Sequence, residues 1–224
     1  MALPLPPLPP TFGGDDAFWH PGGPDVVAVL AEEHRRLAAL CRRLAEPPPA
    51  PPAGAAGPGA PAGPETRAHR AGLVDVLVAA LSRHLSAEEQ YLYPALRAHP
   101  DGAPVAEREL RADAALHREL ERLRTAAARD ADLSHHAAAL GDLLRRHADA
   151  LAADAFPLLR AVASDADLVR LGNRVEIAEE AAPTRPHPGA PMRPPWNRVV
   201  APLLGVWDKV RDALTRRRTH LRDL

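Results

Sequence analysis

Apolar residues recur at intervals of three and four along four segments of the chain, at about residues 25–46, 65–97, 105–129 and 132–162. This spacing follows the 3.6-residue turn of an α-helix, so each segment is predicted to form a helix with one buried face. Residues 47–64 contain only Pro, Ala and Gly, and residues 98–104 contain Pro, Asp and Gly, which predicts loops. Four such helices joined by loops predict an all-α fold, an antiparallel four-helix bundle.

The composition favours helices over strands. The 224 residues include 46 Ala but only 21 Val, Ile and Thr together, and alanine is the best helix former whereas β-branched residues favour strands. The formal net charge of −1 gives no general attraction to nucleic acid. One cysteine excludes an intrachain disulfide, and neither a basic leader nor a run of 18 apolar residues is present. We therefore expect a cytoplasmic protein with no transmembrane segment.

The 26 prolines are clustered and divide the chain into ordered blocks and joints. Residues 1–23 are predicted to be a disordered proline-rich arm, and residues 24–182 the bundle with a short fifth helix at its end. Residues 183–195 are a predicted proline-rich linker, and residues 196–224 a C-terminal amphipathic helix. Three roles stay open for residues 196–219: packing on the bundle, self-association, or peripheral contact with a membrane surface.

Each of the four predicted helices carries one histidine within its apolar stripe; these are His34, His84, His117 and His147. Glu88 stands one turn after His84 on the same stripe, and Asp113 shares the stripe of His117. Burying an unpaired polar group costs several kcal/mol, so four such histidines favour a shared partner. A cation held between imidazoles and a carboxylate is that kind of partner, and this mixed set suits iron, manganese or zinc.

Four segments carry a resemblance to a known family: LAEEHRRLAALCRRL, RHLSAEEQYLYPAL, LHRELERL and RHADALAADAFPLL. They resemble the four helices of the hemerythrin-like, HHE cation-binding domains, over about residues 24–188. The later LGNRVEIAEEAAPTRPHP resembles a tail found in actinobacterial members. The most specific part is H-x-x-x-E-E-x-x-L-Y-P at 84–94, and His147 to Pro157 repeats its ten-residue interval.

The resemblance implies a non-haem di-iron centre inside the bundle. Carried over residue by residue, its ligands are His34, His84, Glu88, His117 and His147. Where family members carry a carboxylate four or five residues after the fourth-helix histidine, this chain has Leu151 and Ala152. Asp113 is the candidate to supply the missing carboxylate from another helix, and Asp154, seven residues after His147, is a weaker candidate. With one bridging carboxylate fewer, we expect a site that is weakly loaded, mononuclear or tuned to the reduced state.

The favoured function is that of a metal-binding protein rather than an enzyme, with O₂, NO or peroxide as the small ligand implied by the resemblance. Tyr91 and Tyr93 are candidate hydrogen-bonding neighbours of the metal ligands, and Leu151 is an apolar one. Tyr91 lies on the stripe of Glu88, where packing in the core is its default role, and it is also the candidate proton donor for an enzyme at this site. Two alternatives stay open. One is an enzyme that consumes peroxide or NO at the same site, and the other is a metal-depleted module that acts through the bundle and the C-terminal helix.

Overall fold

The computed structural model describes residues 22–47, 63–129 and 132–186, together with 204–209, 211–212 and 219 near the C-terminus. Four predicted segments lie wholly or mostly outside these residues: the N-terminal arm, the Pro/Ala/Gly loop, the second proline-rich linker and the C-terminal helix.

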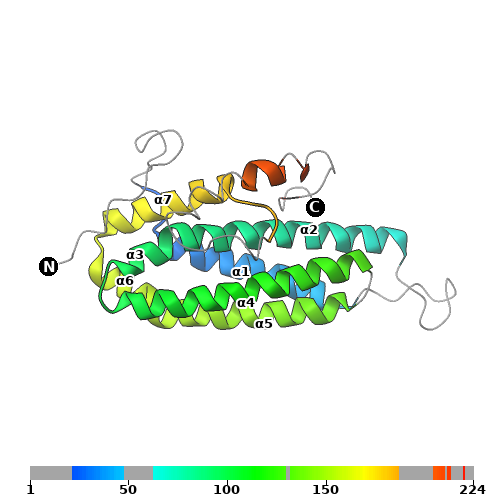
Figure 1. Ribbon diagram of the computed structural model, residues 1–224, viewed down its shortest axis with the longest axis horizontal. Helices are drawn as coiled ribbons and strands as arrows, with labels where there is room; N and C mark the ends of the chain where they lie inside the picture. Colours follow the sequence, from blue (N-terminus) through cyan, green and yellow to red (C-terminus); the bar gives the residue numbers. More distant parts are fainter. Residues whose placement is uncertain are drawn as a thin grey trace.

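Four helical rods lie side by side and form the predicted antiparallel bundle (Figure 1). The first is α1 (Val26–Ala45), and the third is α4 (Gly102–Arg129). The second rod consists of α2 (Pro64–Ala87), the π-helical segment η1 (Glu88–Leu92) and α3 (Tyr93–Arg97). The fourth consists of α5 (Leu133–Ala150), η2 (Leu151–Ala155) and α6 (Phe156–Val162). The described residues contain no strand, so the prediction of an all-α bundle is confirmed.

A π-helical turn precedes a proline in both the second and the fourth rod. The amide of Tyr93 donates to the carbonyl of Glu88, and the amide of Phe156 donates to the carbonyl of Leu151, each five residues back. Pro94 and Pro157 follow directly and cannot donate. A proline ring inside an α-helix clashes with the carbonyl four residues earlier, and a wider turn with one extra residue relieves that clash. The rods therefore continue through the prolines instead of ending at them.

Two apolar clusters fill the bundle. One lies around Leu37, Leu44, Leu77, Leu81 and Leu140, and the other joins the π-helical segments to α1 and the fifth helix. The apolar stripes of the sequence correspond to these clusters, although the buried residue is in places the neighbour of the one predicted. At the start of α1, for example, Val26 is fully buried while Val27 is only partly buried.

The fifth helix, α7 (Asp165–Ala181), packs along α1 and α2 outside the four-helix core (Figure 1). The Ser164 side chain accepts a hydrogen bond from the amide of Asp167 and caps the helix. Leu168, Leu171 and Val175 join the same apolar cluster as the start of α1. A Cβ added at Gly172 would stand 2.7 Å from the carbonyl oxygen of Pro24, so only glycine permits this close approach.

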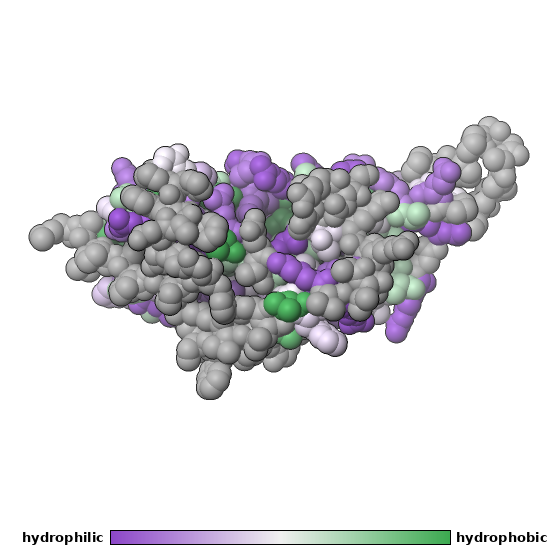
Figure 2. Space-filling model, turned by 90° about the horizontal axis from the view of Figure 1, so that it is seen from above, coloured by the Kyte–Doolittle hydropathy of each residue, from purple (hydrophilic) through white to green (hydrophobic). Residues whose placement is uncertain are grey.

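Residues 204–209 and 211–212 are helical. Two aspartates of this helix contact Thr184 and Arg185. Asp208 accepts from the amides of Thr184 and Arg185, and the Arg185 guanidinium donates to Asp212 at 2.6 Å. Val206 and Trp207 remain 63% and 66% exposed. On the face seen in Figure 2, the described residues are mainly hydrophilic, and hydrophobic residues form only small separate areas. Self-association or peripheral contact through this helix stays a prediction.

No helix among the described residues combines the length and the apolar character that crossing a bilayer requires.

Candidate metal centre

Three helical rods bring four side chains to one point in the middle of the bundle. His34 comes from α1, His84 from the last turn of α2, Glu88 from the first position of η1, and His147 from the last turn of α5. Their exposed fractions are 5%, 1%, 0% and 2%. One possible ligand atom from each lies within 4.8 Å of the other three. The structure therefore brings these four of the predicted residues together.

The donor atoms of the four side chains face one another. Nε2 of His84 lies 3.0 Å from Nε2 of His34 and 3.4 Å from Oε1 of Glu88, which is 3.7 Å from Nε2 of His34. Nε2 of His147 lies 3.1 Å from Oε2 of Glu88. Oε1 of Glu88 is buried without a hydrogen-bond partner among the described residues. A buried carboxylate oxygen normally has a partner, so the site fits a cation placed between these donors.

The outer nitrogens of two histidines meet carboxylates that the sequence stripes did not predict. Nδ1 of His84 lies 2.9 Å from Oε2 of Glu33, and Nδ1 of His147 lies 3.2 Å from Oε2 of Glu109. A carboxylate on the far nitrogen fixes the tautomer and leaves the near nitrogen free to bind metal. Glu33 and Glu109 stand outside the histidine stripes, and the only sequence signal for Glu33 is that it directly precedes His34.

Asp113 is fully buried but lies behind His147, outside the four-donor group. Its Oδ1 is 3.6 Å from Nδ1 of His147, and its Oδ2 accepts a 2.7 Å hydrogen bond from the Tyr93 hydroxyl. The same hydroxyl is 3.2 Å from Oε2 of Glu88. Asp113 is thus linked to the cluster through a tyrosine, and its role as the replacement carboxylate stays a prediction.

His117 also lies outside the group. Its Nε2 is 3.4 Å from Oε1 of Glu89, and its side chain is partly exposed. Glu89 was not predicted as a site residue, although it follows Glu88 directly. The structure therefore brings together four of the six predicted metal ligands, and ligation by His117 stays a prediction.

Of the two candidate tyrosines, Tyr93 is the one whose hydroxyl lies 3.2 Å from Glu88. Tyr91 is buried in the apolar cluster that also contains Leu151. The reason is the π-helical turn between Glu88 and Tyr93, which contains one residue more than a regular helical turn. Tyr93, the fifth residue after Glu88, therefore lies on the side of the helix where a regular α-helix would place the fourth residue. Leu151 is fully buried, and Ala152 after it is exposed. No side chain in these two places supplies a carboxylate.

A comparison with protein-family models matches residues 25–159 to the hemerythrin HHE cation-binding domain. The chain belongs to this family. The match covers the first three rods and the fourth as far as Leu159, and it ends before α7. Searches of curated proteins and of solved structures return no match.

In this HHE domain the charges of the cluster depend on one another. Burial alone would raise the pKa of Glu88, but His84 and His147 hold it well below its usual range. Burial lowers the pKa of both histidines, yet the Glu88 charge and the outer carboxylates outweigh it, and the pKa of His147 rises to about 10. Burial, with the charge of His84, keeps the pKa of His34 well below its usual value. In the metal-free HHE domain, protons on His84 and His147 therefore balance Glu88.

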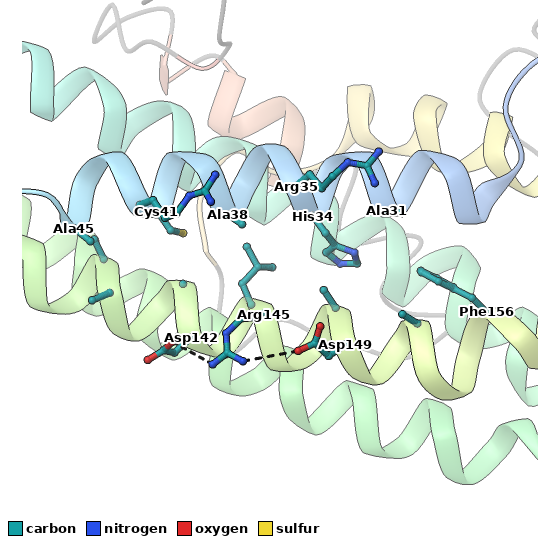
Figure 3. A pocket seen from close by; sticks show the side chains of 17 residues that line it. Ala31, His34, Arg35, Ala38, Cys41, Ala45, Asp142, Arg145, Asp149 and Phe156 are labelled. Atoms are coloured by element: carbon teal, nitrogen blue, oxygen red, sulfur yellow. Dashed lines mark hydrogen bonds and ion pairs between the residues drawn. The ribbon is translucent and has the colours of Figure 1, made fainter.

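A groove of about 630 Å³ runs between α1 and α5 and reaches His34 (Figure 3). Small residues form most of it, with Ala31 and Ala38 on one side and Ala148 and Ala152 on the other. Arg145 crosses its rim between Asp142 and Asp149, at 3.4 and 3.8 Å.

Cys41 lines the groove but is a buried thiol whose pKa burial raises to about 12. It therefore acts as a small apolar residue rather than as a nucleophile.

Proposed function

We propose that this HHE-domain protein holds one non-haem iron ion between His34, His84, Glu88 and His147, and that the site binds a small ligand such as O₂, NO or peroxide. The observation that carries the proposal is the set of four buried donors that face one another, with Oε1 of Glu88 lacking a hydrogen-bond partner among the described residues. Iron in an imidazole–carboxylate set with open positions supplies reversible binding of such molecules.

One ion per chain is the stoichiometry that the side chains favour. The four donors form a single group, and the second family carboxylate is absent at Leu151 and Ala152. Asp113 faces the outer nitrogen of His147 and not the nitrogen that meets Glu88. A second ion would need Asp113 and His117 to turn toward Glu88. We therefore propose a mononuclear centre.

The groove between α1 and α5 supports entry of a small neutral molecule. It is open to solvent, alanine is the most frequent residue in its walls, and it reaches the ligand His34 (Figure 3). The two apolar clusters lie on either side of the four metal-binding side chains and keep bulk water from reaching them from other directions. Neutral diatomic molecules lose little hydration on entering such a groove, whereas ions lose much.

Anaerobic loading with Fe²⁺, followed by metal analysis and optical spectra before and after adding NO or O₂, tests this proposal. We expect about one iron per chain and a spectrum that changes with the added gas. Two tightly held irons per chain would contradict the mononuclear centre. A chain that takes up no iron would favour the metal-free interaction module.

Turnover of peroxide or NO is a second candidate, favoured by the position of Tyr93. Its hydroxyl joins Glu88 and Asp113 and holds a proton next to the donor cluster. An enzyme at this site would need such a proton source. Peroxide consumption by the iron-loaded protein that is lost in Tyr93→Phe, while iron content is kept, would favour turnover over simple binding.

A further inference from the structure

Two large apolar side chains are exposed next to each other on the helical residues 204–209. They are Val206 and Trp207, and no other large apolar side chain among the described residues is exposed to solvent in this way. Figure 1 shows these helical residues in orange-red, outside the bundle and beyond the end of α7. Single exposed apolar residues are common on protein surfaces. The meaning of this pair therefore depends on how the helix is held and on which charges surround it.

The acidic side of the same helix is turned toward the rest of the protein. Asp208 is buried and accepts hydrogen bonds from the amides of Thr184 and Arg185, at 3.1 and 3.0 Å. Asp212 is also buried and accepts a 2.6 Å hydrogen bond from the Arg185 guanidinium. These bonds hold the helix in one orientation, because rotating it about its axis would break them and leave buried polar groups without these partners.

This orientation points Val206 and Trp207 away from the protein. An α-helix turns about 100° per residue, so positions 206 and 207 lie nearly opposite positions 208 and 212. The exposure of the side chains agrees with this geometry, since the two apolar residues are exposed and the two aspartates are buried. The anchoring of the helix therefore presents the apolar pair to its surroundings.

Basic side chains flank the apolar pair. Lys209 and Arg211 are exposed, and a turn of about 100° per residue places one of them on each side of the pair. Val206, Trp207, Lys209 and Arg211 together form a surface that we call the Trp207 face. Both carboxylates of the described helical residues lie on the opposite, buried side. The charged side chains of the Trp207 face are therefore all positive.

The end of the chain that carries this face is basic as a whole. Residues 196–224 contain seven Arg and Lys residues and three Asp residues, whereas the whole chain has a formal net charge of −1. Two of the three aspartates are Asp208 and Asp212, which are bonded to residues 184 and 185. The surface that complements the charge of the Trp207 face is therefore an anionic one.

A second copy of the chain fits this face less well than a lipid surface does. A two-fold contact would bring Lys209 and Arg211 of both copies close together, and like charges repel. The two apolar side chains expose less than about 400 Å² together, whereas a stable protein interface buries about 800 Å² on each partner. A bilayer makes no such demand, because tryptophan is favoured in the headgroup region and anionic lipids attract each basic side chain.

We propose that the Trp207 face binds the anionic surface of a lipid bilayer. The side chains of Val206 and Trp207 enter the headgroup region, where an amphipathic indole ring is favoured. Lys209 and Arg211 lie at the level of the lipid phosphates and are attracted to them. The contact is peripheral and reversible, since two apolar and two basic side chains supply far less than a membrane-spanning helix. The proposal does not depend on metal binding by the bundle.

Sedimentation of the full chain with large lipid vesicles tests this proposal. One set of vesicles contains phosphatidylcholine alone, and the other contains phosphatidylcholine mixed with the anionic phosphatidylglycerol. We expect the chain to bind the mixed vesicles, and to bind them less as the salt concentration is raised. Binding to phosphatidylcholine alone should be weaker by at least about tenfold.

Substitutions on the face and a matched control identify the residues that make the contact. Lys209→Gln with Arg211→Gln should weaken binding to the mixed vesicles by about 10- to 30-fold, and Trp207→Ala should weaken it by about tenfold. Arg111→Gln with Arg118→Gln removes the same charge from exposed positions on α4, across the bundle from residues 204–209 (Figure 1). This control should change binding by less than about twofold.

A wild-type chain that does not bind the mixed vesicles would overturn the proposal, and so would unchanged binding in either face variant. Equal losses in the two double variants would also overturn it, since the attraction would then be a property of the whole chain. Sedimentation velocity without vesicles tests for a second copy. A dimer that is lost in Trp207→Ala, together with no vesicle binding, would assign the face to self-association instead. Thermal melts, expected to agree with the wild type because the substituted side chains are exposed, confirm that the variants are folded.

Discussion

The second and fourth rods of the bundle share one backbone design and differ in chemistry. Each carries a histidine, then a π-helical turn that begins four residues later, then a proline ten residues after the histidine. In the second rod the position four residues after the histidine is Glu88, and in the fourth it is Leu151. The position nine residues after it is Tyr93 in one and Phe156 in the other.

This difference separates what holds the backbone from what holds a metal. Both π-helical turns form, although only one of them carries a carboxylate, because the proline that follows is present in both. The apolar Leu151 and Phe156 fill the core where Glu88 and Tyr93 have polar contacts. His147 therefore depends on a carboxylate from the other rod, since its Nε2 meets Glu88 at 3.1 Å.

Glu88→Gln should have the largest effect, because it removes the one carboxylate that both rods use. We expect metal affinity to fall by at least about 100-fold, beyond the loss typical of an outer hydrogen-bonding partner. The metal-free protein should lose about 3–5 kcal/mol of unfolding free energy at pH 7, since the buried His84 and His147 lose the one counter-charge that they share. Calorimetric titration and urea unfolding measure the two effects.

Glu32→Gln, at an exposed carboxylate on α1 that pairs with Arg35 and Arg36, is the control and should change metal affinity little. Equal effects of the two substitutions would show that Glu88 is not central to the site.

The dependence of His147 on Glu88 should also appear as a pH dependence of the metal-free protein. The pKa of His147, about 10 in the folded protein, lies above that of a histidine in the unfolded chain. The stabilisation that the protonated His147 provides is therefore full below about pH 6.5 and is lost as the pH rises toward 10. Burial raises the pKa of Glu89 to about 8, and burial with Glu33 raises that of Glu179 to about 9. Both glutamates bind protons in the folded state that the unfolded chain has released, so they act in the same direction.

We therefore expect the unfolding free energy in the presence of a chelator to fall steadily between pH 6.5 and 10, by several kcal/mol. Metal affinity should rise over the same range, because binding displaces protons from His84 and His147. Urea unfolding at three pH values, with and without metal, checks both trends. A metal-free stability that is flat or rises with pH would contradict the proton balance described for the cluster.

Tyr93→Phe gives the second rod the side chain that the fourth rod has at this position. The change leaves Oδ2 of the buried Asp113 without its 2.7 Å donor. We expect a loss of about 1–3 kcal/mol in unfolding free energy, the cost of an unsatisfied buried group. An unchanged unfolding free energy in Tyr93→Phe would show that this hydroxyl does not satisfy the buried carboxyl group of Asp113.

Ala152→Asp should have the smallest effect, because it adds a carboxylate to the fourth rod at an exposed position. Ala152 lines the groove that reaches His34, so an aspartate there can approach the cluster. We expect metal affinity to increase by about tenfold, or 1.4 kcal/mol. Ala138→Asp, elsewhere in the groove, is the control. Equal gains in the two variants would indicate a general charge effect rather than a new ligand.

The sequence predicted most of the fold and the centre of the site. The hydrophobic periodicity predicted the four rods and the fifth helix. The histidines within the stripes predicted three of the four side chains that meet at the site, and Glu88, one turn after His84, was predicted as the fourth. The sequence offered Tyr91 and Tyr93 as candidate neighbours without deciding between them, because a regular helical period cannot show where a π-helical turn adds a residue. It also missed Glu33, Glu109 and Glu179, because their contacts join residues at least 38 positions apart.

Local chemistry therefore determined by itself which faces are buried, where helices are interrupted, and that a carboxylate is absent at Leu151 and Ala152. These properties depend on side-chain period and on proline, which act within a few residues of the chain. The tertiary structure alone decided which polar groups meet. It placed Asp113 behind His147 rather than between the histidines, left His117 beside Glu89, and brought Glu179 from the fifth helix to the back of His84. Those outcomes depend on how five helices are rotated against one another, and that rotation is fixed only when their apolar faces pack together.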